Sequence, residues 1–136
     1  MTPAERLQRY LERELELLVR YGELQGKIEK YVHAGQADLV AVQAGEARRL
    51  ADECAELERT ARPLAARAGG DRLRELEARL AAGRESALAA GRRSQAALSD
   101  SLGELAARIR ELQGRPRTPS SPFTRIGRPM LVDLDS

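Results

Sequence analysis

The chain has 136 residues, which corresponds to about one domain and excludes a large multidomain enzyme. Apolar residues make up 42% of the chain, charged residues 32% and aromatic residues only 3%, a balance that favours helices over strands. The 23 basic and 21 acidic side chains leave a net charge of +2, too small to bind nucleic acid or a membrane by bulk attraction.

The first predicted helix begins at Thr2, where a hydroxyl cap is followed by Pro3 and by the acidic Glu5. Its large apolar residues then repeat about every seven positions, at Leu7, Tyr10, Leu17, Tyr21, Leu24, Ile28 and Tyr31, with Leu11, Leu18 and Val32 beside them. A face this wide is typical of a helix buried in a bundle. Glu14 interrupts the face at an inward position, so we expect a polar contact or local exposure there.

A short turn or kink is predicted at residues 33–37, and Asp38 is expected to cap a second helix over about 39–67. The inward positions of this helix are mostly small, at Val40, Ala47, Leu50, Cys54, Leu57, Ala61 and Leu64. Small residues that face the large ones of the first helix allow close packing. Pro63 should kink or end the helix nearby, because proline lacks a backbone donor.

Gly69 and Gly70 mark the clearest break in the chain and predict a hairpin turn, after which Asp71 caps a third helix that runs to about Gln113. Its apolar positions begin at Leu73, Leu76 and Leu80 and continue, after a step of eight residues, at Leu88. This step is a stutter in the heptad pattern. At 1.5 Å per residue the third helix is the longest, unless it breaks at Gly83 or Gly91. A continuous helix leaves its last turns with an apolar stripe that nothing in the chain covers: Leu98, Leu102, Leu105, Ile109 and Leu112.

The tail, residues 114–136, holds four of the six prolines and no helical period, and we expect it to be disordered when free. It also carries apolar residues that an inert linker does not need, and we take five of them as candidate partner contacts: Phe123, Ile126, Leu131, Val132 and Leu134. The sequence thus predicts an all-α fold, an antiparallel bundle or hairpin of three long helices over 1–113, followed by a flexible Pro/Arg-rich tail over 114–136.

Residues that carry chemistry are scarce. The single cysteine, Cys54, and the single histidine, His33, fall on different predicted helices, although a nucleophilic pair needs contact and an orienting third group. No spacing typical of a metal site or of a phosphate-binding glycine loop occurs, and acidic residues lie among the local basic groups. We therefore expect no enzyme activity, no catalytic residue, no cofactor or metal, no small-molecule substrate and no nucleic acid.

The single cysteine and the absence of a signal-peptide pattern favour a reducing cytoplasm. No apolar stretch approaches the roughly 20 residues that cross a bilayer, so we expect no direct membrane insertion.

Two segments resemble flagellar export chaperones of the FlgN-like family. KIEKYVHAGQADLVAVQAGEARRLADECAELERTARPL is similar to the centre of these chaperones, where a turn of the Gly-x-x-Asp-Leu type, here Gly35, Asp38 and Leu39, precedes a helix with an early Glu, here Glu46. The closing segment FTRIGRPMLVDLDS is similar to the tail of one branch of the family. Together the two segments cover somewhat under half of the chain.

The resemblance implies a cytoplasmic chaperone that binds the C-terminal segments of hook-associated flagellar subunits and delivers them to the type III export gate. The stripe from Leu98 to Leu112 would then be the cargo face. Phe123 would stand at the gate-docking position, where the family usually has tyrosine. The alternative from the residues alone is a structural coiled-coil component of the export apparatus, such as a stalk that couples to its ATPase. Self-association into a homodimer through the stripe also stays open.

Overall fold

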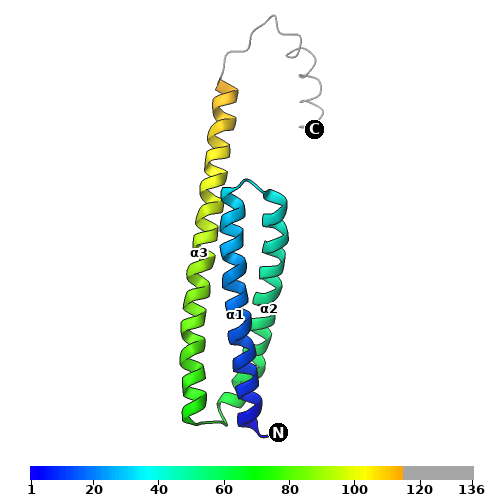
Figure 1. The fold of residues 1–136 in the computed structure, drawn as a ribbon, viewed down its shortest axis with the longest axis vertical. Helices are drawn as coiled ribbons and strands as arrows, with labels where there is room; N and C mark the ends of the chain where they lie inside the picture. Colours follow the sequence, from blue (N-terminus) through cyan, green and yellow to red (C-terminus); the bar gives the residue numbers. More distant parts are fainter. Residues whose placement is uncertain (115–136) are drawn as a thin grey trace, which may run out of the picture. The chain divides into compact units, whose positions relative to one another are not determined.

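The computed structural model describes residues 1–114 and contains three helices in that range: α1 (Pro3–His33), α2 (Ala37–Ala65) and α3 (Asp71–Gly114). Met1–Ser101 form one compact unit, and the chain from residue 102 onward belongs to a second. In the first unit α1 and α3 run in the same direction and α2 runs in the opposite one (Figure 1). The predicted all-α antiparallel bundle is therefore confirmed. The predicted disorder of the tail lies outside the described residues.

The start of α1 follows the capping pattern in the sequence. The Thr2 hydroxyl accepts a hydrogen bond from the Glu5 backbone N–H at 3.2 Å, and Pro3 takes the first helical position. Proline costs nothing there, because the N–H it lacks would have no partner inside the helix.

The turn between α1 and α2 is built on Gly35. Its φ of +71° lies in the left-handed region that glycine adopts without strain. The Gly35 N–H donates to the Val32 carbonyl at 3.1 Å and the Gln36 N–H donates to the Tyr31 carbonyl at 3.0 Å. These two bonds form a Schellman motif, which satisfies carbonyls at the end of α1.

The expected role of Asp38 as the cap of the second helix is wrong. Because the Schellman turn closes at Gln36, the chain re-enters helix at once, and the Gln36 carbonyl already accepts from the N–H groups of Leu39 and Val40 at 3.1 Å each. Gln36 is the N-cap residue, and its side chain makes no capping bond. Asp38 lies in the first turn instead, where a carboxylate interacts favourably with the helix dipole.

Replacement of glycine by alanine should change the free energy of unfolding in opposite directions at Gly22 and at Gly35. Gly22 lies within α1 with open space at its Cβ position, so Gly22→Ala should raise the free energy of unfolding by about 0.5–1 kcal/mol through backbone entropy. Gly35→Ala places a Cβ at positive φ and should lower it by about 1–2 kcal/mol. Urea unfolding followed by circular dichroism measures both, and two effects of equal sign would contradict the assigned turn.

The core of the first unit consists mainly of leucines and alanines from all three helices, together with Ile28 and Val32 of α1. At one end the large side chains dominate, in a cluster of Leu7, Leu11, Ala61, Leu73, Leu76 and Leu80. Toward the other end large residues of α1 meet small ones of α2 and α3, in a cluster of Ile28, Val32, Ala47 and Ala97. The predicted packing of large α1 residues against small α2 residues is thus present.

The predicted break after α2 is also confirmed. The helix ends at Ala65, two residues beyond Pro63, and Gly70 has a φ of +136° just before α3. The cap predicted at Asp71 is wrong: Asp71 is the first residue of α3, and the Gly70 carbonyl accepts the hydrogen bond from the Arg74 N–H at 3.1 Å. The sequence left open whether the third helix is interrupted, and α3 is continuous through Gly83 and Gly91. It ends at Gly114, one residue beyond the expected end.

The position of the expected stutter is wrong. The side chain of Leu88 is 60% exposed, and Ala87, seven residues after Leu80, is buried in its place. The buried side chains of α3, here called the buried seam, keep heptad spacing throughout the first unit: Leu73, Leu76, Leu80, Ala87, Ala90, Ser94 and Ala97. At Gly83 a Cβ atom would lie only 3.2 Å from Leu15 Cδ1, so α3 approaches α1 closely on the side of small residues.

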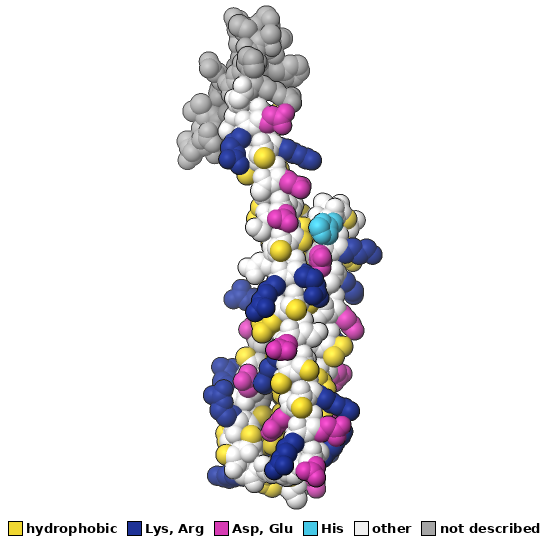
Figure 2. Space-filling view, turned by 90° about the vertical axis from the view of Figure 1, so that its left-hand side faces the viewer, with side chains coloured by type: hydrophobic (Ala, Val, Ile, Leu, Met, Phe, Trp, Pro, Cys, Tyr) yellow, Lys and Arg dark blue, Asp and Glu magenta, His cyan; other side chains and the backbone are white. Residues whose placement is uncertain are grey.

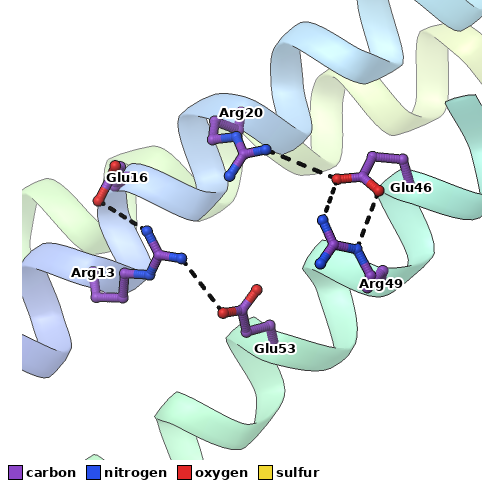
Figure 3. A network of polar contacts seen from close by, with 6 residues as sticks. All are labelled: Arg13, Glu16, Arg20, Glu46, Arg49 and Glu53. Atoms are coloured by element: carbon purple, nitrogen blue, oxygen red, sulfur yellow. Dashed lines mark hydrogen bonds and ion pairs between the residues drawn. The ribbon is translucent and has the colours of Figure 1, made fainter.

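Charged side chains cover the surface between α1 and α2. Figure 3 shows Arg13 and Arg20 of α1 pointing toward Glu53 and Glu46 of α2, at 3.5 and 3.8 Å. All are exposed or half-buried, and such pairs contribute only about 0–1 kcal/mol each. Acidic and basic groups alternate over the face seen in Figure 2, without a large field of one sign. Electrostatic steering of a nucleic acid is therefore not a feature of this face.

Candidate functional site

Among residues 1–114, the largest group of exposed apolar side chains lies on the last turns of α3. Five large residues, here called the apolar face, are exposed by between 40% (Leu98) and 62% (Leu112): Leu98, Leu102, Leu105, Ile109 and Leu112. Their spacing of four, three, four and three residues places them on one side of the helix. Residues 101–114 are all exposed. An apolar stripe of this regularity is a feature of helices that pack against another helix.

The apolar face is out of phase with the buried seam. The seam ends at Ala97, and the apolar face begins at the next residue, Leu98. Had the heptad spacing of the seam continued, its next members would have been Ser101, Glu104 and Arg108. The shift in heptad register that the apolar residues of the sequence indicate therefore lies between Ala97 and Leu98.

The borders of the apolar face are mostly uncharged. In heptad terms its flanking positions are Ser99, Ser101, Ala106, Arg108 and Gln113. Small and neutral flanks let a partner backbone approach closely and give little electrostatic selection. A partner would therefore gain affinity from this surface chiefly by burying its apolar area.

The other predicted partner contacts are Phe123, Ile126, Leu131, Val132 and Leu134, and they lie outside the described residues. Their role remains a prediction. The structure does describe the residues of the α1–α2 turn that carry the resemblance. Gly35 forms the turn, Asp38 lies in the first turn of α2, and Leu39 is 39% exposed. Glu46 bonds to Arg49 of its own helix and lies 3.8 Å from Arg20 of α1. The hydrogen bond from Arg49 holds the pKa of the Glu46 carboxyl below its usual value.

Cys54 has the properties of a packing residue. Its side chain is half-buried, and burial, helped by the negative charges of Glu14 and Glu53, raises the pKa of its thiol to about 11. At neutral pH, only a very small fraction of Cys54 is therefore present as the reactive thiolate. His33, which ends α1, is exposed and lies in the last turn of that helix, where a basic group suits the helix dipole.

Glu14 is the buried ionisable group of the bundle. Only 3% of it is exposed, and the Arg84 guanidinium donates from Nη2 to both of its carboxylate oxygens, at 3.0 and 3.3 Å. Arg84 also lies 4.0 Å from Glu58, so this one residue of α3 pairs with carboxylates on both other helices. Burial raises the pKa of Glu14, against the opposing effect of Arg84 and with a smaller contribution from Glu58 in the same direction.

The sequence predicted either a polar contact or local exposure at Glu14; the structure shows the contact, and its partner was not predicted. Arg84 is one of many arginines, and only the parallel alignment of α1 with α3 singles it out. A second buried polar contact has nearly the same offset between the two helices: the Ser94 hydroxyl donates to the Gln25 side-chain oxygen. Within residues 1–114, every buried side-chain nitrogen or oxygen has a partner.

Across the described part of the chain, no group of three or more His, Cys, Asp or Glu side chains is placed to hold a metal ion. In the same residues no helix combines the length and the apolar character that a membrane span requires. Comparisons of the chain with protein-family models, with curated proteins and with solved structures found no match.

Proposed function

We propose that this protein is a flagellar export chaperone, similar to the FlgN-like family, that binds amphipathic C-terminal segments of hook-associated subunits in the cytoplasm. It would keep them from aggregating or assembling early and deliver them to the type III export gate. The observation that carries the proposal is the apolar face, five large side chains in helical register that residues 1–114 leave uncovered. The resemblance of the centre and the tail to these chaperones supplies the identity of the cargo.

The size of the apolar face suits reversible binding. Full burial of a large apolar side chain contributes about 1.5–3 kcal/mol, so five partly buried ones give on the order of 5–10 kcal/mol gross. Ordering a flexible cargo segment costs about 2–5 kcal/mol of that gain. The difference is at most about 8 kcal/mol, which corresponds to a dissociation constant that is micromolar at its tightest. A carrier that must release its cargo requires binding of this moderate strength.

The tail is proposed as the contact with the export gate. Phe123 would provide the aromatic group, and Ile126, Leu131, Val132 and Leu134 would provide the apolar surface beside it. This assignment comes from the resemblance. In it, α3 binds the cargo and the tail contacts the export gate. A variant of Phe123 should then bind cargo normally and fail at the gate.

Calorimetry tests the cargo proposal directly. The full chain is titrated with C-terminal segments of hook-associated subunits at concentrations up to about 50 times a micromolar dissociation constant. Leu105→Ser combined with Ile109→Ser should weaken binding about a hundredfold, because both remove central contacts.

The matched control combines Val19→Ser with Val42→Ser. These valines are exposed by 56% and 65% and belong to α1 and α2 rather than to α3, so binding should change by less than about threefold. No heat with any segment, or an equal loss in the control, would overturn the proposal. Stimulation of an export ATPase without affinity for the segments would assign the protein to the coupling stalk instead.

A further inference from the structure

Leu88, which lies outside the buried seam, shares the heptad register of the apolar face. Seven residues before Leu102 stands Gln95, and seven residues before that stands Leu88. Gly91 likewise precedes Leu98 by seven residues. Because α3 is one continuous helix, these positions extend the two rows of the apolar face toward the start of α3. Leu88 is 60% exposed, so the extension reaches a further exposed leucine.

The first unit has an open groove of about 330 Å³ at Leu88, bordered by all three helices. Its apolar lining consists of Leu18 and Tyr21 of α1, Ala51, Cys54 and Ala55 of α2, and Ala87 and Leu88 of α3. Arg84 borders the groove together with its partners Glu14 and Glu58. All of these residues belong to the first unit. The groove therefore places apolar surface of α1 and α2 beside the extended row of α3.

Small residues on both sides give a partner helix close access to the groove. On α2 the positions that recur every three or four residues along the groove side are all exposed: Ala44, Arg48, Ala51 and Ala55. On α3, Gly91 has no side chain, and the atom nearest to its Cβ position is the Tyr21 hydroxyl oxygen, at 3.6 Å. Helices with small residues pack closely against large ones. The groove thus suits a helix that carries large apolar side chains.

The charges beside this surface favour an acidic partner. Between Leu88 and Leu112 the charged side chains at the flanking heptad positions of α3 are Arg92 and Arg108. On α2, Arg48 stands in the exposed row that borders the groove. A second copy that docked through its own α3 would bring the same two flanking arginines to this surface, and like charges oppose such pairing. Acidic flanks on a different polypeptide are complementary to it.

We propose that the cargo segment that covers the apolar face continues into this groove, as one amphipathic helix with acidic residues at its flanks. From Leu88 to Leu112, α3 is about 36 Å long at 1.5 Å per residue, which corresponds to about 25 residues of bound helix. A large apolar side chain of the segment enters the groove beside Leu88. This inference rests on the proposed function and adds the length, the flanking charge and a second contact of the cargo.

The variant Leu88→Ser tests the second contact. Calorimetry with the full chain compares a C-terminal segment of a hook-associated subunit, about 30 residues long, with the same segment shortened by about ten residues at either end. The long segment should bind at least about tenfold more tightly than one of the shortened segments. Leu88→Ser should remove this difference, because only the long segment reaches position 88.

Val19→Ser is the matched control for Leu88→Ser. Val19 is 56% exposed and borders a different groove, with Leu15 of α1 and Leu76 of α3. The difference in affinity between the long and the shortened segments should remain in this variant. Circular dichroism checks that both variants keep their helical content, which we expect because both side chains are largely exposed.

A cysteine on α2 reports directly whether the segment occupies the groove. In a Cys54→Ala background, Ala51→Cys places a thiol at an exposed position of the groove wall. A saturating amount of the long segment should slow maleimide labelling there at least about fivefold and leave labelling of Val19→Cys unchanged. Arg48→Glu should weaken binding of the long segment about threefold to tenfold at low salt, with a smaller effect at high salt.

Three results would overturn the inference and leave the proposed function standing. They are a Leu88→Ser variant that keeps the difference between the segments, a thiol at position 51 that the bound segment does not protect, and an Arg48→Glu variant that binds as tightly as the original chain. Protection of position 51 by higher protein concentration, without any segment, would assign the groove to a second copy and also overturn it. Failure of every segment to bind would overturn both the inference and the proposed function.

Discussion

Replacing Arg84 by methionine should lower the free energy of unfolding by about 2–4 kcal/mol at pH 7, because it leaves the carboxylate of Glu14 buried without its donor. Methionine retains most of the apolar stem of the arginine, so that the loss reports the missing guanidinium. The value is below that of a fully buried pair because the Arg84 side chain is 43% exposed. Urea unfolding followed by circular dichroism gives the difference.

The loss should depend on pH in a defined direction. Burial raises the pKa of Glu14 above its ordinary 4.5, so the folded state favours the protonated carboxyl. The stability that this group contributes is lost as the pH rises through its folded pKa. Without Arg84 that pKa rises further, and the deficit of the variant should be largest at neutral pH and shrink toward pH 4.5.

The double variant Glu14→Gln/Arg84→Met supplies the control. It removes the charge that Arg84 neutralises, and we expect it to recover at least about half of the loss at pH 7, with little pH dependence of the difference. A loss that is equal at pH 4.5 and pH 7 would contradict a buried carboxylate at position 14. It would indicate that Arg84 acts through packing.

Leu76→Ala should lower the free energy of unfolding by about 2–5 kcal/mol, the usual cost of a large cavity in a core. Leu76 is 2% exposed and belongs to the cluster that joins all three helices. Alanine has the higher helix propensity, so none of the loss comes from the helix itself. Chemical unfolding of the full chain measures the effect.

Leu102→Ala makes the same chemical change on the same helix and should alter the stability by no more than about 0.5 kcal/mol. Leu102 is 57% exposed, so little packing is lost. A loss comparable to that of Leu76→Ala would mean that the apolar face is covered in solution. Sedimentation across a range of concentrations would then show whether a second copy of the chain covers it.

The number of helices and most of their ends followed from the sequence, because they depend on local features. The cap at Thr2, the break at Gly69 and the end after Pro63 each involve a few neighbouring residues. The cap predicted at Asp38 was wrong because the turn before it depends on a backbone conformation. The left-handed Gly35 shortens the turn, and this conformation is not visible in a pattern of apolar residues.

The buried side of α3 beyond Leu80 was not predicted correctly. A search for large apolar residues favoured Leu88, whereas the heptad spacing of Leu73, Leu76 and Leu80 continues to the small Ala87, which the structure buries. The polar pairs Glu14 with Arg84 and Gln25 with Ser94 could not be predicted either, because only the parallel alignment of α1 and α3 brings these residues together. The exposed stripe from Leu98 to Leu112 was predicted because it needs only a continuous helix.

The single cysteine has a consequence for oxidation. With a thiol pKa of about 11, only about one molecule in ten thousand carries the ionised sulfur at pH 7. Air oxidation and exchange with glutathione both begin from that form. Two copies of this protein should therefore cross-link only slowly through Cys54, even without a reductant.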